Sequence, residues 1–310
     1  IEINRLKEQA VQGLVIDLRN NGGGSLKTVV DMAGMFIESG PVVQVKYFDK
    51  EKQVLRDRDR SILWNGPLVI LVNEGSASAS EILAAAMQDY ERAIIIGGNQ
   101  TWGKGTVQNV FPLNRMVRGN TKGDLGALRY TTQKYYRVNG GSVQLEGVKS
   151  DINLPFRYKY LDFGEKDSEN PLQWDEIENI NYKKWNSNFD FDFAIKNSQK
   201  RIKESEHLKL VDENAKWIKD VREKKIFNLN YQKFRSELEQ NIKITDKFKK
   251  LDNFSLKYSF KSLPYESQMI ENDSILGTKR ERWHKSLNKD IYIGEALNVL
   301  SDLRFSYLEN

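Results

Sequence analysis

The chain has 310 residues, more than one hydrophobic core usually organises, so we expect two domains. Its net charge is only +5 and it has no Lys/Arg stripe, so nothing points to a nucleic-acid partner. The absence of Cys excludes a thiolate nucleophile, a disulfide framework and a cysteine zinc site. Both histidines, His207 and His284, lie in the second half, which argues against a Ser-His-Asp triad or a His-rich metal centre in the first. We therefore expect no metal site and no cofactor. We also expect no membrane span, because the longest aliphatic run, residues 68–72, is far below the roughly 20 residues that a span needs.

Glycine and charge both divide the chain near residue 160. Of the 21 glycines, 18 lie in residues 1–160, and this part holds 21 Lys and Arg against 16 Asp and Glu. Residues 161–310 balance 27 basic against 27 acidic residues. We therefore predict one domain at residues 1–160 and a second at residues 161–310, with a linker at residues 164–170.

Strand-like and helix-like segments alternate through the first 100 residues, which is typical of an α/β layered fold. Apolar positions at helical spacing predict a mostly helical domain from about residue 165, as in the stripe that contains Ile293, Ala296 and Leu300. The expected strands of the first part are residues 13–19, 42–48, 67–72, 93–96, 106–113 and 128–138, and its expected helices are residues 26–37 and 82–90.

Residues 76–81, Ser-Ala-Ser-Ala-Ser-Glu, lie between a predicted buried strand and the start of a helix. A serine in such a turn meets free backbone N–H groups and the positive end of the helix, where a developing oxyanion is stabilised. The alternative is helix capping, because Ser78 with Glu81 three residues later fits a capping box. Both interpretations can hold together, since the cap geometry can itself aim a nucleophile.

Residues 101–108, Thr-Trp-Gly-Lys-Gly-Thr-Val-Gln, place Lys104 between two glycines just before an extended run. Small neighbours let other groups close over the lysine, and a desolvated lysine loses its charge more readily, so it can act as a base. Positions 104 and 108 share one face of a strand, which predicts that the Gln108 amide holds the Lys104 amine. The alternative is a surface lysine in a glycine turn.

Two further glycine-containing turns follow predicted strands. Residues 98–104 match the opening of a phosphate-binding P-loop, but Gly105 stands where a magnesium-binding Ser or Thr belongs, and the following residues continue like a strand. Residues 20–25, Asn-Asn-Gly-Gly-Gly-Ser, join a strand to a helix, so their amides can form half of an oxyanion hole. The alternative for this run is that the glycines serve backbone geometry alone.

Four ordered blocks together resemble the tail-specific, or C-terminal processing, proteases. They are Gly-Leu-Val-Ile-Asp-Leu-Arg-Asn-Asn-Gly-Gly-Gly (13–24), Ser-Ala-Ser-Ala-Ser-Glu-Ile (76–82), Ala-Ala-Ala-Met-Gln-Asp-Tyr (84–90) and Gly-Lys-Gly-Thr-Val-Gln (103–108). Residues 128–141 and 147–151 resemble the family too, and the helical remainder is similar to the extra C-terminal domain of its larger periplasmic members. The resemblance implies a Clp protease/crotonase-like layered β/α core followed by a mostly helical C-terminal domain.

The resemblance also implies a Ser/Lys dyad, which fits a region with neither His nor Cys. By motif, Ser78 is the nucleophile, Lys104 the general base and Gln108 the residue that orients the lysine. The segment before Lys104 is one residue longer than the family pattern, so we expect this loop to bulge for Lys104 to reach Ser78. Ser78 and Asp89 are eleven residues apart, so we expect them on one helix face. The remaining implied site residues are Ala79 with Gly23 or Gly24 for the oxyanion, and Asp89, Glu81 and Thr101 in supporting positions.

The implied activity is that of a serine endopeptidase that cleaves unfolded or tail-marked proteins with apolar C-termini, in the periplasm or cell envelope and with an envelope adaptor protein as a further partner. Family members recognise such tails with a PDZ domain ahead of the first block, and nothing in this sequence resembles one. Because the sequence starts at Ile1 without Met, we expect a C-terminal fragment with weak or absent activity. The alternative is a noncatalytic binding module on a crotonase-like scaffold, with Ser78 as a cap and Lys104 on a turn.

Overall fold

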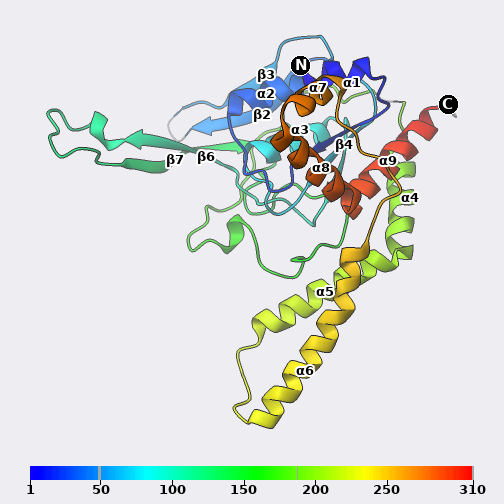
Figure 1. Ribbon diagram of the computed structural model, residues 1–310. Coiled ribbons are helices and arrows are strands. Elements are labelled where there is room, and N and C mark those ends of the chain that lie inside the picture. The colour runs from blue at the N-terminus through cyan, green and yellow to red at the C-terminus, as the bar shows by residue number, and fades with distance from the viewer. Residues whose placement is uncertain (48–49, 187, 309–310) are drawn as a thin grey trace.

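The computed structural model describes residues 1–47, 50–186 and 188–308, and within them the strands form two four-stranded sheets. The predicted α/β core followed by a helical region is confirmed (Figure 1). The first sheet is parallel and has the order β1 (Leu14–Asp17), β4 (Leu68–Val72), β5 (Ile94–Gly97), β8 (Ile152–Asn153). The second is antiparallel and has the order β3 (Gln53–Asp57), β2 (Gly40–Tyr47), β7 (Ala127–Tyr136), β6 (Thr106–Pro112).

Three helices belong to the first half of the chain and six to the second, counted over the described residues. The first three are α1 (Glu2–Glu8), α2 (Leu26–Gly34) and α3 (Ala79–Asp89). The others are α4 (Phe191–Glu204), α5 (Glu206–Glu223), α6 (Tyr231–Phe248), α7 (Pro264–Asn272), α8 (Ser274–Asn288) and α9 (Ile291–Leu308). Over all the described residues, no helix combines the length and the apolar character that crossing a bilayer requires.

Strand β4 is buried along its whole length because the parallel sheet is covered on both faces. Successive side chains of a strand point to opposite faces. Leu68 and Ile70 accordingly join a cluster with α2, α3 and β2, whereas Val69 and Leu71 join a second cluster with helices of the C-terminal half. The continuous apolar run in the sequence thus results from two separate cores.

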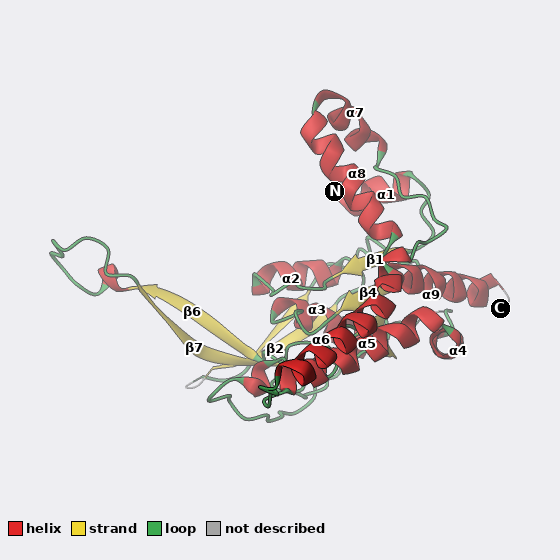
Figure 2. Cartoon of the chain, turned by 60° about the horizontal axis from the view of Figure 1, so that its bottom comes forward, coloured by secondary structure: helices red, strands yellow, loops and turns green. Residues whose placement is uncertain are grey.

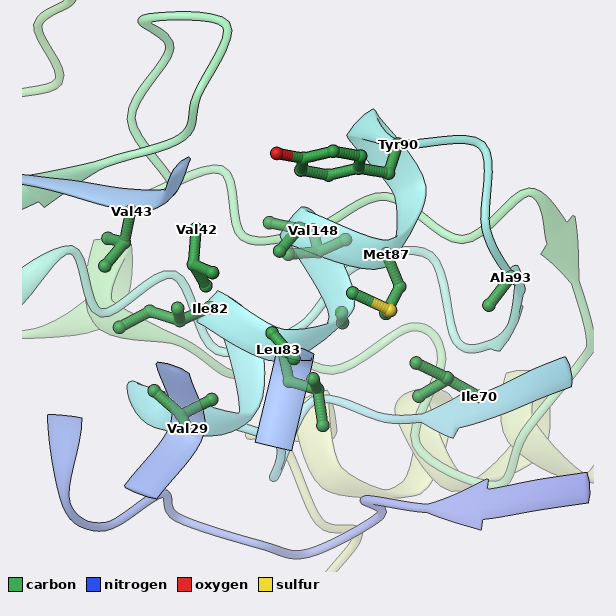
Figure 3. Close-up of a cluster of buried hydrophobic side chains, with 14 of the residues drawn as sticks. Val29, Val42, Val43, Ile70, Ile82, Leu83, Met87, Tyr90, Ala93 and Val148 are labelled. Carbon is green, nitrogen blue, oxygen red and sulfur yellow. The ribbon is translucent and has the colours of Figure 1, made fainter. Parts of the chain in front are cut away.

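Helix α3 fills the layer between the two sheets. Figure 3 shows Leu83 and Met87 of α3 packed among Val29 of α2, Val42 of β2 and Ile70 of β4. This packing fixes helix α3 between the two sheets, and the Ser78 turn directly precedes the helix.

Helices α4 and α9 cover the other face of the parallel sheet, with the first turn of α5 beside them, and Figure 1 shows α9 beside α4. Ala194 of α4, Leu208 of α5 and Val299 and Leu303 of α9 pack there on the strands. Helices α4 and α9 therefore form a layer of the core, whereas α6, α7 and α8 have no buried residues. The division at residue 160 stays a prediction from composition.

The segment between the core and α4 lies along the core. Ile180 N–H donates to the Val138 carbonyl at 3.0 Å, and Trp185 N–H donates to the Tyr90 carbonyl at 2.8 Å. The predicted linker, residues 164–170, is not a free tether, because Glu165 N–H donates to the Trp102 carbonyl at 2.9 Å.

Strands β6 and β7 form a long ribbon that extends away from the body of the molecule (Figures 1 and 2). Strand β2 pairs with β7 only over Gln133–Tyr136, so the outer part of the ribbon has two strands. The register of the ribbon shifts between Val107 and Gln108, just after the loop that carries Lys104.

Several element boundaries differ from the prediction. Helix α2 ends at Gly34, three residues early, although Phe36 and Ile37 are buried as their helical spacing suggested. Strand β3 was not predicted, because three of its five residues are polar and it lies at the edge of its sheet. The strand predicted at residues 42–48 is β2, and Phe48 lies outside the described residues.

Candidate active site

Ser78 is the N-cap residue of α3 and has an unusual backbone, with φ 57° and ψ −116°. A positive φ is uncommon for a residue other than glycine, and a cap residue ordinarily has extended angles. Glu81 Oε2 accepts the Ser78 N–H at 2.7 Å, as in a capping box, while Glu81 N–H donates to the Ser78 carbonyl at 2.9 Å. Capping therefore explains the Glu81 contact but not the strained backbone of Ser78, which is a feature typical of functional turns.

The glycine loop, residues 20–25, contacts this turn through Gly23. At Gly23, φ is +94°, and a Cβ would lie 2.7 Å from Ala79 N and 2.9 Å from Ser78 Cβ, so only glycine fits. The Gly23 N–H is already used, since it donates to Asn21 Oδ1 at 2.9 Å. Over the described residues, the N–H groups of Gly24 and Ala79 donate to no protein acceptor. These two amides are thus the ones available to an oxyanion.

Lys104 is half-buried and its Nζ donates to Gln108 Oε1 at 3.3 Å. Within the part of the chain that the structure describes, no hydrogen bond joins Lys104 Nζ to Ser78 Oγ. The structure therefore brings Lys104 to Gln108 but does not bring its amine to the hydroxyl of Ser78.

The backbones of the serine turn and the lysine loop are nevertheless joined, because both bind the Glu81 carboxylate. Its Oε2 accepts the N–H groups of Ser78 (2.7 Å) and Lys104 (3.0 Å). Its Oε1 accepts the Thr101 hydroxyl (2.6 Å) and Gly103 N–H (2.7 Å). Burial raises the pKa of Glu81 to about 7, although these four hydrogen bonds act in the opposite direction. Glu81 and Thr101, expected in supporting positions, lie at the centre of this arrangement.

Tyr135 of β7 makes a second bridge between the two loops. Its hydroxyl lies 2.5 Å from the Lys104 carbonyl oxygen and 3.2 Å from that of Ser78. Burial raises the pKa of Tyr135 well above its ordinary value, so the hydroxyl remains a donor. The sequence indicated a strand at residues 128–138 and a resemblance over residues 128–141, but it did not single out Tyr135. The inward direction of Tyr135 follows from its strand's pairing with β6 and β2, which the sequence does not reveal.

Asp89 lies at the far end of α3. The eleven residues of this helix place it about 16 Å from Ser78. Asp89 pairs instead with Arg137 at 2.6 Å and accepts Asn139 Nδ2 at 2.9 Å. A shared helix face therefore does not bring Asp89 to the serine, and its contacts hold the end of β7 against α3.

The phosphate-binding alternative for residues 98–104 is contradicted by the loop itself. A P-loop needs free backbone N–H groups. Here the amides of residues 101–105 all donate to protein acceptors, namely Val148 O, Ser76 O, Glu81 Oε1, Glu81 Oε2 and Gln144 Oε1 in chain order.

A cavity of about 180 Å³ lies next to the glycine loop. The candidate oxyanion residues Gly23, Gly24 and Ala79 form part of its wall. The remaining wall has an apolar side, formed by Leu18, Val29, Met32 and Leu83, and a polar side, formed by Asn21, Ser25, Thr28 and Ser80. The cavity is of a size to take a single apolar side chain.

The chain is similar to known proteases in sequence. A tail-specific protease of Haemophilus influenzae is 41% identical over 237 residues, which are 75% of this chain and 34% of the relative. A carboxy-terminal-processing protease of Bartonella bacilliformis is 38% identical over 165 residues, which are 51% of this chain and 36% of the relative. The chain thus spans about a third of the length of these relatives.

One solved structure to which the chain is similar is a photosystem II D1 C-terminal processing protease, with 36% identity and a TM-score of 0.41 over 48% of this chain and 36% of the other. Two family descriptions match adjoining parts of the sequence. Residues 2–154 match Peptidase family S41, and residues 158–304 match the C-terminal domain of tail specific protease. The chain therefore belongs to peptidase family S41, and it carries the C-terminal domain of the tail-specific proteases.

Proposed function

We propose that this chain carries the acyl-transfer centre of a serine endopeptidase, with Ser78 as nucleophile and Lys104 as general base. Ser78 Oγ attacks a peptide carbonyl carbon, the neutral Lys104 amine takes the hydroxyl proton, and that proton then goes to the leaving amine. Water hydrolyses the resulting ester and frees the serine. The observation that carries the proposal is the strained Ser78 turn in contact with Gly23, next to two unpaired amides.

The oxyanion of the tetrahedral intermediate would be bound by the N–H groups of Ala79 and Gly24. Ala79 N–H lies at the start of α3, where the helix dipole favours negative charge. Gly24 is a better candidate than Gly23 for the second donor, because the Gly23 N–H already donates to Asn21 Oδ1.

The dyad requires the Lys104 amine to move from Gln108 to Ser78. Because Glu81 and Tyr135 already hold the two backbones together, we expect rotation of the Lys104 side chain to make this movement. Gln108 is then the residue that retains the amine between proton transfers. The alternative, a noncatalytic module that binds unstructured proteins without cleaving them, is favoured by the lack of a hydrogen bond between Lys104 Nζ and Ser78 Oγ among the described residues.

The substrates that fit are unfolded or tail-marked proteins with apolar C-termini. The apolar side of the cavity beside Gly24 and Ala79 supports an apolar side chain next to the cleaved bond. The curated relatives are named for tail-specific and carboxy-terminal processing, and this supports a location in the periplasm or cell envelope, where an adaptor protein can deliver substrates. Because the chain spans about a third of these relatives, we expect it to be weakly active by itself.

The test is cleavage of an unstructured protein with an apolar C-terminus, followed on a gel, by the chain and by any longer natural protein that contains it. Ser78→Ala and Lys104→Ala should each abolish cleavage while the circular dichroism spectrum is unchanged. Ser236→Ala is the control, since it removes an exposed hydroxyl on helix α6, outside the proposed site, and should leave cleavage intact. Full activity of either the Ser78 or the Lys104 variant would contradict the dyad, and binding without cleavage by the unaltered protein would support the noncatalytic module.

A further inference from the structure

Arg19 connects the glycine loop to the C-terminal helical region. Its guanidinium pairs with Asp17 at 2.9 and 2.6 Å and with Asp290 at 2.8 and 3.3 Å. The side chains of Arg19 and Asp290 are only 18% and 22% exposed, so this pair is shielded from solvent far better than a surface ion pair. Arg19 lies in the part matched to Peptidase family S41, and Asp290 lies in the part matched to the tail-specific protease C-terminal domain.

The glycine loop is exposed, and only a short series of contacts leads from Arg19 to the catalytic serine. Asn20 follows Arg19 directly, and its N–H donates to Asn73 Oδ1 at 2.8 Å. The Asn73 side-chain amide donates back to Asn20 Oδ1 at 3.0 Å. The Asn21 carbonyl then accepts the N–H of Ala77, the neighbour of Ser78, at 3.0 Å. A shift of Arg19 would therefore move the loop relative to Ser78.

Asp290 is a rigid anchor because it also begins helix α9. Its Oδ1 accepts the N–H groups of Tyr292 (2.9 Å) and Ile293 (3.2 Å), which fixes the side chain at the N-terminus of the helix. Val299 and Leu303 of the same helix are packed in the second core of the parallel sheet. The position of Asp290 is thus set by the core.

We propose that Asp290 is a positioning residue for the acyl-transfer centre: through Arg19 it holds the glycine loop where the Gly24 amide can bind the oxyanion together with Ala79. The inference rests on the proposed function above and assigns the C-terminal helical region a role in catalytic rate without contact with the substrate. Its physical basis is that oxyanion donors act only when they are preorganised, so a loop free to drift loses transition-state stabilisation.

Asp290→Asn separates the two roles of this side chain, because Asn caps a helix as well as Asp but carries no charge for Arg19. We expect the rate at which a fluorophosphonate reagent phosphonylates Ser78, with loss of fluoride, to fall about tenfold, while KM for a peptide substrate stays within about twofold. Amide hydrogen exchange over residues 18–25, measured by mass spectrometry, should become faster. Asp302→Asn is the matched control: it breaks the 2.8 Å pair of the same helix with Arg201, within the helical layer, and should change neither readout.

An unchanged rate of phosphonylation and unchanged exchange in a folded Asp290→Asn variant would overturn the inference, and so would a raised KM with an unchanged phosphonylation rate. If the Asn variant loses helix α9, Asp290→Ser repeats the test with another capping residue. If the unaltered protein is not labelled at Ser78, the acyl-transfer proposal fails, and the exchange comparison still decides whether Asp290 holds the loop.

Discussion

Glu81 can hold two loops because a carboxylate has two oxygens, each of which accepts more than one hydrogen bond. The sequence indicated the local half of its role, since Ser78 and Glu81 have capping-box spacing. It could not indicate the bonds to Thr101 and Gly103, because they depend on a loop about twenty residues later folding back over α3.

The pKa of Glu81 predicts a pH dependence of stability. Burial raises this pKa from 4.5 to about 7, so the folded state binds a proton more tightly than the unfolded chain does. The resulting stabilisation is complete below pH 4.5 and is lost as the pH rises through about 7. Relative to Glu81→Gln, in which this group does not titrate, the free energy of unfolding should fall by on the order of 3 kcal/mol over that range. Urea denaturation of both proteins at several pH values measures it, and parallel curves would show that the carboxyl is not shifted.

Tyr135 and Tyr136 provide a matched pair of residues for testing the second bridge. Tyr135→Phe removes the hydroxyl near the carbonyls of Lys104 and Ser78, and should lower kcat with little change in KM, at a stability loss of about 1 kcal/mol. Tyr136→Phe removes a hydroxyl that binds Asp175 at 3.0 Å, away from the serine turn, and should leave kcat intact. Equal effects of the two variants on kcat would mean that the Tyr135 hydroxyl has only a structural role.

The glycine loop shows that adjacent residues of one sequence run can differ in their tolerance of substitution. A Cβ at Gly23 would clash with the backbone of Ala77 and Ala79 at 2.6 and 2.7 Å, and its φ of +94° is also unfavourable for alanine. At Gly22, no atom lies within 4 Å of a Cβ. Gly23→Ala should therefore abolish Ser78 acylation and lower stability by about 1–3 kcal/mol, whereas Gly22→Ala should be neutral. Thermal unfolding and fluorophosphonate labelling test both, and a harmless Gly23→Ala would show that the loop can shift.

Elements with a strong periodic pattern were predictable from the sequence, because local apolar spacing alone determines their type. Strand β4 and helix α3 belong to this class, and both were predicted close to their observed bounds. Strand pairing was not predictable. The role of Tyr135 and the ribbon of β6 and β7 depend on this pairing, so they were not predictable either. The Lys104–Gln108 contact was expected from strand alternation and is present, although the strand itself begins only at Thr106.

For the whole molecule, composition placed a division at residue 160, but packing continues across it. The composition of a segment reflects how much of its surface is exposed to solvent, but it says little about which segments pack against each other. The apolar faces of α4 and α9 were visible as helical stripes, whereas the partner of those stripes, the second face of the parallel sheet, was not.

We predict that residues 1–160 do not fold alone. Removing the helices would expose the second-face side chains of β4 and β5, namely Val69, Leu71, Ile94 and Ile96, all of which are fully buried. Burial of each such side chain contributes about 1.5–3 kcal/mol, so the loss is comparable to the whole stability of a typical domain. Expression of residues 1–160 should give an aggregated product, measured by size-exclusion chromatography, and a folded monomer would contradict the layered arrangement.

The packing of α9 on β1 and β4 has a consequence for the order of events during synthesis. A ribosome makes the residues of β1 about 270 positions before those of α9, so one face of the sheet stays uncovered until Ile293–Leu303 emerge. The pair between Arg19 and Asp290 closes at the same late moment. On the acyl-transfer proposal, a nascent chain would gain its ordered glycine loop, and with it the second oxyanion donor, only once the helical layer is in place.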